Sequence, residues 1–275
     1  MFESVIPRVL GWVPISLRRA LIGRPDHPSR FATFAHNLLN RLPQSESQAF
    51  ACHGALEGYR MSVDWSRYRS FVYGTWEPKV IRAVTDTVKA GMTIIDIGAH
   101  IGYYSLLFAK CVGPAGTVFA FEPLPGNFAV LQMNVRLNNL QNVHLRNQAV
   151  FSRTQEITIT APDDQPNPGN GTIHNETGPN HFCVEAVALD DFCAEFALRP
   201  GILKMDVEGY EYDVLTGAQE TINRCRPDLL IELHHFDGNL AGNRVPELLA
   251  GWGYQIQWLE RWQLTSLILA KPSAN

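Results

Sequence analysis

Short apolar strand patterns alternate with helical patterns through most of the chain, and this alternation restricts the fold more than any other feature. Each such strand is followed at once by a helix, and the pairs are Thr93–Ile97 with Tyr104–Cys111, Thr117–Phe121 with Asn127–Leu137, Ile202–Val207 with Glu211–Ile222, and Leu229–Leu233 with Val245–Ala250. Parallel strands need crossover helices, so the pattern predicts a mostly parallel sheet with helices on both faces. The last two strands, Tyr254–Trp258 and Leu267–Ala270, have no helix between them and predict an antiparallel pair.

Other segments give weaker patterns. Leu56–Val63 is predicted to be a strand, and a helix over Val80–Val88 is predicted to end near Gly91. Shorter strands are predicted at Val143–Leu145 and Ala149–Phe151. A long loop at 161–181 carries four prolines and three glycines between the predicted strands Ile157–Thr160 and Val184–Leu189. Because loops of this length at the end of a sheet often cover a site, we expect a mobile lid there.

The composition describes a globular chain with no surplus of positive charge. Among 275 residues 45% are apolar, and 23 Lys and Arg stand against 27 Asp and Glu, a net charge of −4. Disorder of the whole chain is therefore excluded, and nucleic acid is an unexpected partner because phosphate contacts need clustered Lys and Arg. The five cysteines are scattered without a Cys-x-x-Cys pair, which excludes a zinc ribbon and favours free thiols in a reducing compartment.

The N-terminal part has no pattern that indicates catalysis. Its apolar run, Val9–Leu17, is shorter than the about 20 residues that a membrane span needs. Arginines beside this run allow a peripheral membrane contact, but a helical arm packed on its own domain or on a second subunit is the favoured interpretation. We expect residues 1–72 to form this arm and cap, residues 73–275 to form the main domain, and the protein to be soluble, cytoplasmic and plausibly a homodimer.

The segment Asp96-Ile-Gly98-Ala99-His100-Ile-Gly102 joins a strand to a helix through two glycines. Glycine lets the backbone turn sharply and approach a ligand at the carboxyl end of the strand. The spacing does not fit the dinucleotide fingerprint Gly-x-Gly-x-x-Gly. It resembles instead the first motif of S-adenosylmethionine-dependent methyltransferases, in which an acid such as Asp96 suits a cofactor that carries an ammonium and a sulfonium.

A second acid, Glu122, ends the next strand in Phe-Glu122-Pro123. A carboxylate in this position can accept hydrogen bonds from both ribose hydroxyls of a nucleoside. Gln148 and Ala149 follow the strand after that and are candidates near the adenine. The predicted cofactor residues are Asp96, Gly98, Ala99, His100, Gly102, Glu122, Pro123, Gln148 and Ala149.

Charged side chains also follow the strands beyond the long loop. Lys204, Asp206 and Glu208 alternate and should project to one side of an extended segment, where a buried strand rarely carries charge without pairing or function. Glu232 and His234 end the next strand on a common side. In a parallel sheet these two strand ends open onto the same crevice.

At this point the sequence resembles the FkbM-type methyltransferases. The resemblance covers about Tyr73 to Ala270, with His100 where the family more often has Asn. It rests on five segments: Asp-Ile-Gly-Ala-His-Ile-Gly at 96–102, Phe-Glu-Pro at 121–123, Val-Ala-Leu-Asp-Asp-Phe at 187–192, Lys-Met-Asp-Val-Glu-Gly-Tyr-Glu at 204–211 and Ile-Glu-Leu-His at 231–234.

The resemblance implies a Rossmann-like, seven-stranded, mostly parallel sheet, S-adenosylmethionine as cofactor, and O-methylation of a sugar, cyclitol or glycosylated metabolite or glycan. Two other functions remain open, a non-catalytic cofactor-binding module and a methyltransferase acting on RNA. The intact acids argue against the first, and the acidic balance argues against the second.

An alcohol needs help to lose its proton near neutral pH, and two arrangements of the predicted catalytic residues Lys204, Asp206, Glu208 and His234 could supply it. In one, Asp206 or His234 is a general base in a metal-free site and Lys204 balances the charge. In the other, Asp206, Glu232 and His234 bind a divalent ion such as Mg²⁺.

Overall fold

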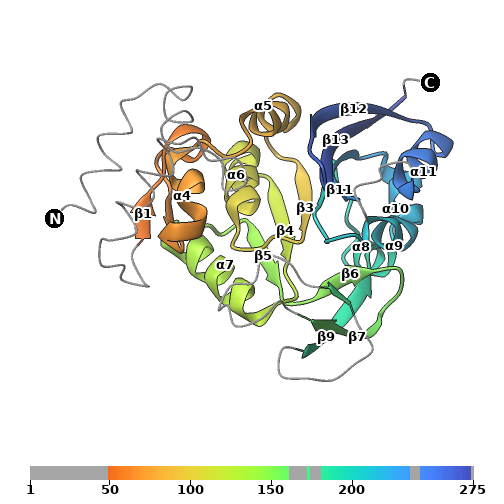
Figure 1. Ribbon diagram of the computed structural model, residues 1–275, viewed down its shortest axis with the longest axis horizontal. Helices are drawn as coiled ribbons and strands as arrows, with labels where there is room; N and C mark the ends of the chain where they lie inside the picture. Colours follow the sequence, from red (N-terminus) through yellow and green to blue (C-terminus); the bar gives the residue numbers. More distant parts are fainter. Residues whose placement is uncertain (1–48, 161–171, 174–180, 236–241, 274–275) are drawn as a thin grey trace. The chain divides into compact units, whose positions relative to one another are not determined.

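The computed structural model describes residues 49–160, 172–173, 181–235 and 242–273 (Figure 1). Residues 1–48 of the predicted N-terminal arm and cap, and nearly all of the predicted lid, lie outside these residues. Contacts divide the chain into two compact units. One runs up to Arg82 and includes Gln132–Asn139, and the other comprises Ala83–Leu131 and Leu140–Asn275. The five cysteines, all of which lie in the described residues, form no disulfide.

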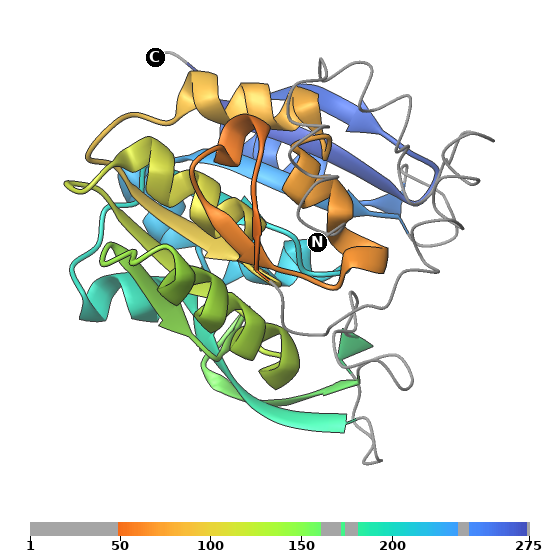
Figure 2. The ribbon, with the colours of Figure 1, turned by 90° about the vertical axis from the view of Figure 1, so that its left-hand side faces the viewer.

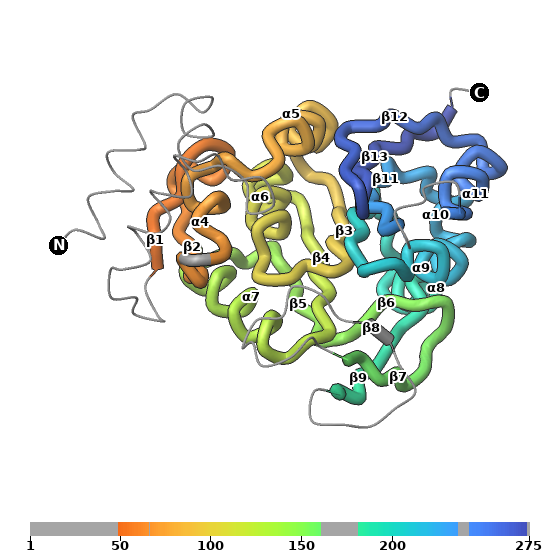
Figure 3. Tube along the Cα trace, in the orientation of Figure 1, coloured from red at the N-terminus to blue at the C-terminus, as the bar shows by residue number. Residues whose placement is uncertain are grey.

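The elements follow one another in an α/β order (Figure 1, Figure 3). In chain order they are β1 (Ala49–Ala51), η1 (Gly54–Leu56), β2 (Arg60–Ser62), α4 (Trp65–Tyr73), α5 (Pro78–Thr87), β3 (Thr93–Ile97), α6 (Tyr103–Val112), β4 (Thr117–Phe121), α7 (Pro125–Leu137), β5 (Val143–Arg146), β6 (Ala149–Phe151), β7 (Gln155–Thr160), β8 (Thr172–Ile173), β9 (His181–Ala188), α8 (Leu189–Glu195), β10 (Ile202–Met205), α9 (Glu211–Thr216), α10 (Gln219–Cys225), β11 (Asp228–His234), α11 (Val245–Gly251), β12 (Tyr254–Arg261) and β13 (Thr265–Pro272).

A seven-stranded sheet in the order β12-β13-β11-β10-β3-β4-β5 forms the centre of the larger unit. The strands from β11 to β5 are parallel, whereas β13 pairs antiparallel with both β11 and β12. The predicted mostly parallel α/β sheet, with its antiparallel final pair, is therefore confirmed.

Helices cover both faces of this sheet, with α6 on one face and α8 to α11 on the other (Figure 1). The second face holds the larger core, in which Ile95 and Ile97 of β3 and Leu203 and Met205 of β10 are buried together with Leu215 of α9. Side chains of a strand alternate between faces. The residues between these apolar ones, including Asp96 and Lys204, therefore project toward the face that α6 covers.

A second sheet of four strands has the order β6-β9-β7-β8, and its long pair β7–β9 is seen in green and teal in Figure 2. Strand β8 pairs antiparallel with β7. The segment 161–181 is predicted to be a loop throughout, and this is wrong at two places: at Thr172–Ile173, where backbone hydrogen bonds extend the sheet, and at His181, where β9 begins.

Three predicted elements differ from the structure because glycines or backbone turns interrupt them. Leu56–Val63 is not one strand, because Gly58 has a φ of 90° and separates η1 from β2. The helix predicted over Glu211–Ile222 is divided at Gly217, where a Cβ would lie 2.2 Å from the carbonyl oxygen of Phe151. Strand β10 ends at Met205 rather than Val207, and Glu208 has a left-handed φ of 53°.

In the smaller unit, β1 and β2 form an antiparallel pair. Asn134 is buried there, accepting a hydrogen bond from the backbone N–H of Ser62 at 2.6 Å and donating one to its carbonyl oxygen at 3.2 Å. Among the described residues the structure contains no helix with both the length and the apolar character needed to cross a membrane.

Candidate active site

The sheet has a topological switch point between β3 and β10, where the order in which strands are added reverses. Strands β4 and β5 are added on one side of β3, and β10 and β11 on the other. In open α/β sheets the carboxyl ends of strands at such a switch point border the ligand crevice. The register pairs Lys204 with Asp96, so the two charged segments found in the sequence are neighbours in space.

The turn after β3 is compact because three of its residues have a left-handed φ: two glycines and, at 51°, His100. Gly98 has a φ of 73°, and a Cβ there would lie 1.8 Å from the carbonyl oxygen of Asp206. Gly102 has a φ of 93° and begins α6. The N–H groups of Gly98 and Ala99 donate to the carbonyl oxygen of Phe121 at 3.0 and 2.8 Å. These glycines therefore permit close approach between protein segments, besides any approach to a ligand.

Glu122 ties this turn to the end of β4. Its Oε2 accepts a hydrogen bond from the backbone N–H of His100 at 2.8 Å, and its Oε1 accepts from Leu124 N–H at 3.0 Å and Asn127 Nδ2 at 3.3 Å. Burial raises the pKa of the Glu122 carboxyl to about 7, although these hydrogen bonds oppose the rise. Oε2 accepts only one bond among the described residues, so it retains acceptor capacity for a hydroxyl donor.

Asn147 supports the same corner, and sequence reasoning missed it. Its Nδ2 donates to the carbonyl oxygens of Glu122 and Pro123 at 2.9 and 3.1 Å. The available signal was its position directly after a strand. Of the two candidates beside it, Gln148 donates to Glu185 Oε2 at 2.9 Å, and Ala149 is buried at the start of β6.

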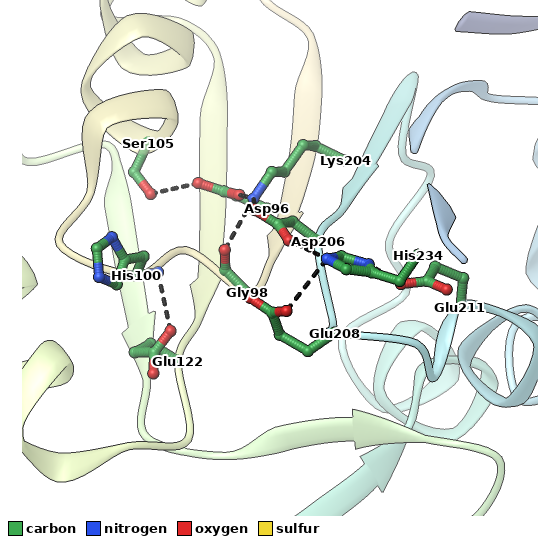
Figure 4. A network of polar contacts seen from close by, with 10 residues as sticks. All are labelled: Asp96, Gly98, His100, Ser105, Glu122, Lys204, Asp206, Glu208, Glu211 and His234. Atoms are coloured by element: carbon green, nitrogen blue, oxygen red, sulfur yellow. Dashed lines mark hydrogen bonds and ion pairs between the residues drawn. The ribbon is translucent and has the colours of Figure 1, made fainter. Parts of the chain in front are cut away.

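Asp96 and Lys204 form a buried ion pair beneath the turn (Figure 4). Lys204 Nζ lies 3.3 Å from Asp96 Oδ1 and donates to the carbonyl oxygen of Gly98 at 2.8 Å. The hydroxyl of Ser105, from α6, donates to Asp96 Oδ2 at 2.6 Å. Burial lowers the pKa of Lys204, but the charges of Asp96 and Asp206 outweigh it and leave the pKa raised.

Asp206, Glu208 and His234 converge at the ends of β10 and β11 (Figure 4). His234 Nε2 lies 3.1 Å from Glu208 Oε2 and 3.9 Å from Asp206 Oδ1. The Asp206 side chain is 33% exposed, more than those of Glu208 and His234. Because Asp206 and Glu208 lie beyond the end of β10, strand alternation does not bring them together; the turn at Glu208 does.

Glu211 completes this group, and sequence reasoning did not assign it to the site. It is 1% exposed, and its Oε1 lies 2.7 Å from His234 Nδ1. Burial alone lowers the pKa of His234, but hydrogen bonds to Glu208 and Glu211 and the charge of Asp206 raise it to about 11. Carboxylates at both ring nitrogens thus favour the protonated form of His234, whereas a general base must be neutral to accept a proton.

Ligand-forming atoms of Asp206, Glu208 and His234 lie within 4.8 Å of one another, so they could hold a cation. Glu232 was expected in this role and is not among them. The charge of these three residues also differs from that of the expected metal site, because Glu208 pairs directly with His234.

Two features of these residues suit a nucleoside cofactor with a positively charged tail. A glycine turn precedes a helix at a switch point, and an ionisable acid with spare acceptor capacity ends the neighbouring strand. The α/β fold with its seven-stranded, mostly parallel sheet is that of the class I methyltransferases. The sequence profile of the Methyltransferase FkbM domain matches residues 96–256, and the chain belongs to this family. It is thus a methyltransferase, and S-adenosylmethionine is the methyl donor of the family.

Three curated relatives illustrate the range of the family. Methyltransferase 1 of Beauveria bassiana is 28% identical over 59% of this chain and 72% of its own length. The 2-O-methyltransferase NoeI of Sinorhizobium fredii is 29% identical over 69% of this chain and 84% of its own. The 31-O-demethyl-FK506 methyltransferase FkbM of Streptomyces tacrolimicus is 27% identical over 62% of this chain and 75% of its own.

Proposed function

We propose that this protein transfers a methyl group from S-adenosylmethionine to a hydroxyl of a sugar, a cyclitol or a glycosylated metabolite or glycan. One observation carries the proposal: an ionisable acid, Asp206, lies directly against the glycine turn, its carbonyl oxygen next to Gly98. An acid in that position can take a proton from an acceptor oxygen held near the methyl donor. The names of two relatives, a 2-O-methyltransferase and a 31-O-demethyl-FK506 methyltransferase, support oxygen as the acceptor atom.

On the cofactor side, Glu122 accepts hydrogen bonds from the ribose hydroxyls. The backbone from Gly98 to Gly102, with Ala99 and His100, borders the amino-acid end. Asp96 supports the turn and with it the amino-acid end, by holding Ser105 and Lys204 beneath the turn. Pro123, Gln148 and Ala149 remain the candidates on the adenine side.

On the acceptor side, Asp206 accepts the hydroxyl proton as the new O–CH₃ bond forms. When bound, S-adenosylmethionine supplies a methyl group on a sulfonium, so transfer to an alcohol leaves a neutral thioether and one proton. Asp206 is the most exposed of the three converging side chains and the best placed to meet an acceptor. The His234 imidazolium balances the negative charges of Asp206 and Glu208 throughout.

We propose further that transfer needs no metal ion. A divalent ion bound to Asp206, Glu208 and His234 would have to replace the contact between His234 Nε2 and Glu208 Oε2, which lie 3.1 Å apart. The imidazolium already provides the positive charge that Mg²⁺ would otherwise supply to the carboxylates.

Calorimetry and a methyl-transfer assay test these proposals together. We expect the protein to bind S-adenosylmethionine and to incorporate labelled methyl groups into sugar or cyclitol acceptors, with turnover retained after exhaustive chelation. Asp206→Asn should reduce turnover at least about a hundredfold, the contribution typical of general base catalysis, without weakening cofactor binding. Binding without transfer to any acceptor would favour a non-catalytic module, and activity lost to chelator and restored by Mg²⁺ would contradict the metal-free mechanism.

A further inference from the structure

We infer that Glu211 is a positioning residue of the methyl-transfer site, holding the imidazole of His234 by Nδ1 so that Nε2 faces Asp206 and Glu208. This inference rests on the proposed function, in which Asp206 receives the acceptor proton. It adds to that proposal a buried residue that meets neither the cofactor nor the acceptor.

The contacts of Glu211 are specific. It is the first residue of α9, and its side chain is 2% exposed. Its Oε1 lies 2.7 Å from His234 Nδ1 and accepts a hydrogen bond from the backbone N–H of Gly209 at 2.9 Å. His234 is the last residue of β11. A single oxygen of Glu211 thus joins the start of a helix, the preceding turn and the end of a neighbouring strand.

The ring orientation follows from this bond. A carboxylate is only an acceptor, so Nδ1 must carry the hydrogen that it shares with Glu211. With Nδ1 held, Nε2 is directed to Glu208 Oε2 at 3.1 Å and Asp206 Oδ1 at 3.9 Å. If His234 turned about its side-chain bonds, Glu208 would lose its cationic neighbour and Asp206 would keep only Lys204, whose Nζ lies 3.9 Å from Asp206 Oδ2.

The charge balance explains why a carboxylate occupies this buried position. Three acids face His234: Asp206 and Glu208 from the turn after β10, and Glu211 from α9. His235, the next residue along the chain, is a further titratable neighbour, and burial together with the charge of His234 lowers the pKa of His235. A buried carboxylate is costly unless paired. Glu211 meets that cost by its contact with His234 Nδ1, and the same contact holds the ring in place.

A purely structural role is the alternative, because Glu211 also fixes the N–H of Gly209. Glu211→Gln separates the two roles. The amide keeps the size and an acceptor oxygen for Gly209, but it removes the negative charge beside Nδ1. Glu220→Gln is the matched control, since Glu220 is an exposed acid in the first turn of the next helix, α10.

Nitrogen-15 NMR of the histidine rings gives a readout that needs no acceptor substrate. In the full-length wild-type protein we expect His234, assigned with His234→Gln, to keep the signature of an imidazolium from about pH 6 to about pH 9. In Glu211→Gln the neutral form should appear within this range, and Glu220→Gln should match the wild type. An unchanged His234 signal in Glu211→Gln would overturn the inference.

Kinetics give the second readout. Glu211→Gln is expected to lower kcat at least about tenfold, equal to about 1.4 kcal/mol, while S-adenosylmethionine affinity stays within about twofold of wild type. Unchanged kcat despite a shifted His234 signal would also overturn the positioning role. If no acceptor is methylated by the wild type, the proposed function fails, yet the NMR result still decides whether Glu211 controls His234.

Discussion

The site is held together by four charged side chains that are buried in the larger unit. They are Asp96, Glu122, Lys204 and Glu211. Each has a partner that offsets the cost of removing charge from water. Lys204 pairs with Asp96, Glu211 with His234, and Glu122 accepts three hydrogen bonds. Asp206, which is more exposed than these four, is thereby left to meet the acceptor.

Replacing Glu122 should weaken cofactor binding. Glu122→Ala removes an ionised acceptor, and because each such hydrogen bond contributes about 1.5–3 kcal/mol, S-adenosylmethionine affinity should fall at least about tenfold. The pKa of about 7 adds a pH dependence. Below that pH the carboxyl gains a proton and loses acceptor capacity, so wild-type affinity should fall as the pH is lowered from about 8 to about 6.

Calorimetry across this pH range measures both effects. Glu156→Ala, which removes an exposed acid of β7, is the control and should bind like the wild type. A folded Glu122→Ala protein with wild-type affinity would refute the assignment of Glu122 to the cofactor.

Lys204 should contribute mainly to stability and to the shape of the turn. Lys204→Met leaves the Asp96 carboxylate buried without its cation, which typically costs about 3–5 kcal/mol. Denaturant unfolding followed by circular dichroism should detect this loss. Lys110→Met, which removes an exposed lysine of α6, should change the unfolding free energy by less than about 0.5 kcal/mol. A loss in Lys204→Met no greater than in the control would show that the ion pair is dispensable.

At the scale of elements, the site depends on how closely the ends of β3 and β10 approach. The backbone N–H of Asp206 donates to the carbonyl oxygen of Ile97 at 3.1 Å, so pairing continues one residue past β10. The carbonyl oxygen of Asp206 then occupies the space that a side chain at position 98 would need. Glycine at this position is therefore what lets the two strand ends form one site.

Substitutions at Gly98 and Gly91 together test this close approach. Both have a left-handed φ, 73° and 80°, but a Cβ at Gly91 would meet nothing within 4 Å. Gly91→Ala should cost about 1 kcal/mol through backbone strain alone. Gly98→Ala adds a backbone collision and should cost at least about 3 kcal/mol and reduce cofactor affinity. Equal unfolding free energies for the two variants would contradict the collision.

For the whole molecule, net charge limits the range of acceptors. The −4 balance provides no surplus of Lys and Arg with which to neutralise a phosphate backbone. We expect labelled methyl groups to enter sugar or cyclitol acceptors and not bulk RNA. Incubation of the protein with RNA and labelled S-adenosylmethionine at low salt, where electrostatic attraction is greatest, is the most sensitive test. Incorporation into RNA under these conditions would favour the RNA alternative.

Local pattern was enough to predict the α/β architecture and the segments that carry chemistry. Alternating strands and helices, the Gly98–Gly102 turn and the acid at Glu122 are short-range features, readable wherever residue spacing reflects backbone geometry. The same features carried the resemblance to the FkbM methyltransferases, which the family profile confirms. The assignments of individual residues to cofactor and acceptor remain predictions.

Tertiary structure alone decided which charged groups meet. The register of β3 with β10 pairs Lys204 with Asp96 more closely than with Asp206. The position of β11 beside β10 and the left-handed turn at Glu208 bring His234 to Glu208 and Glu211, and leave Glu232 out of the group that could hold a cation. Contacts of this kind join residues distant in sequence, and they depend on strand order and on glycine-permitted close approaches. The local periodicity of the sequence shows neither the strand order nor these close approaches.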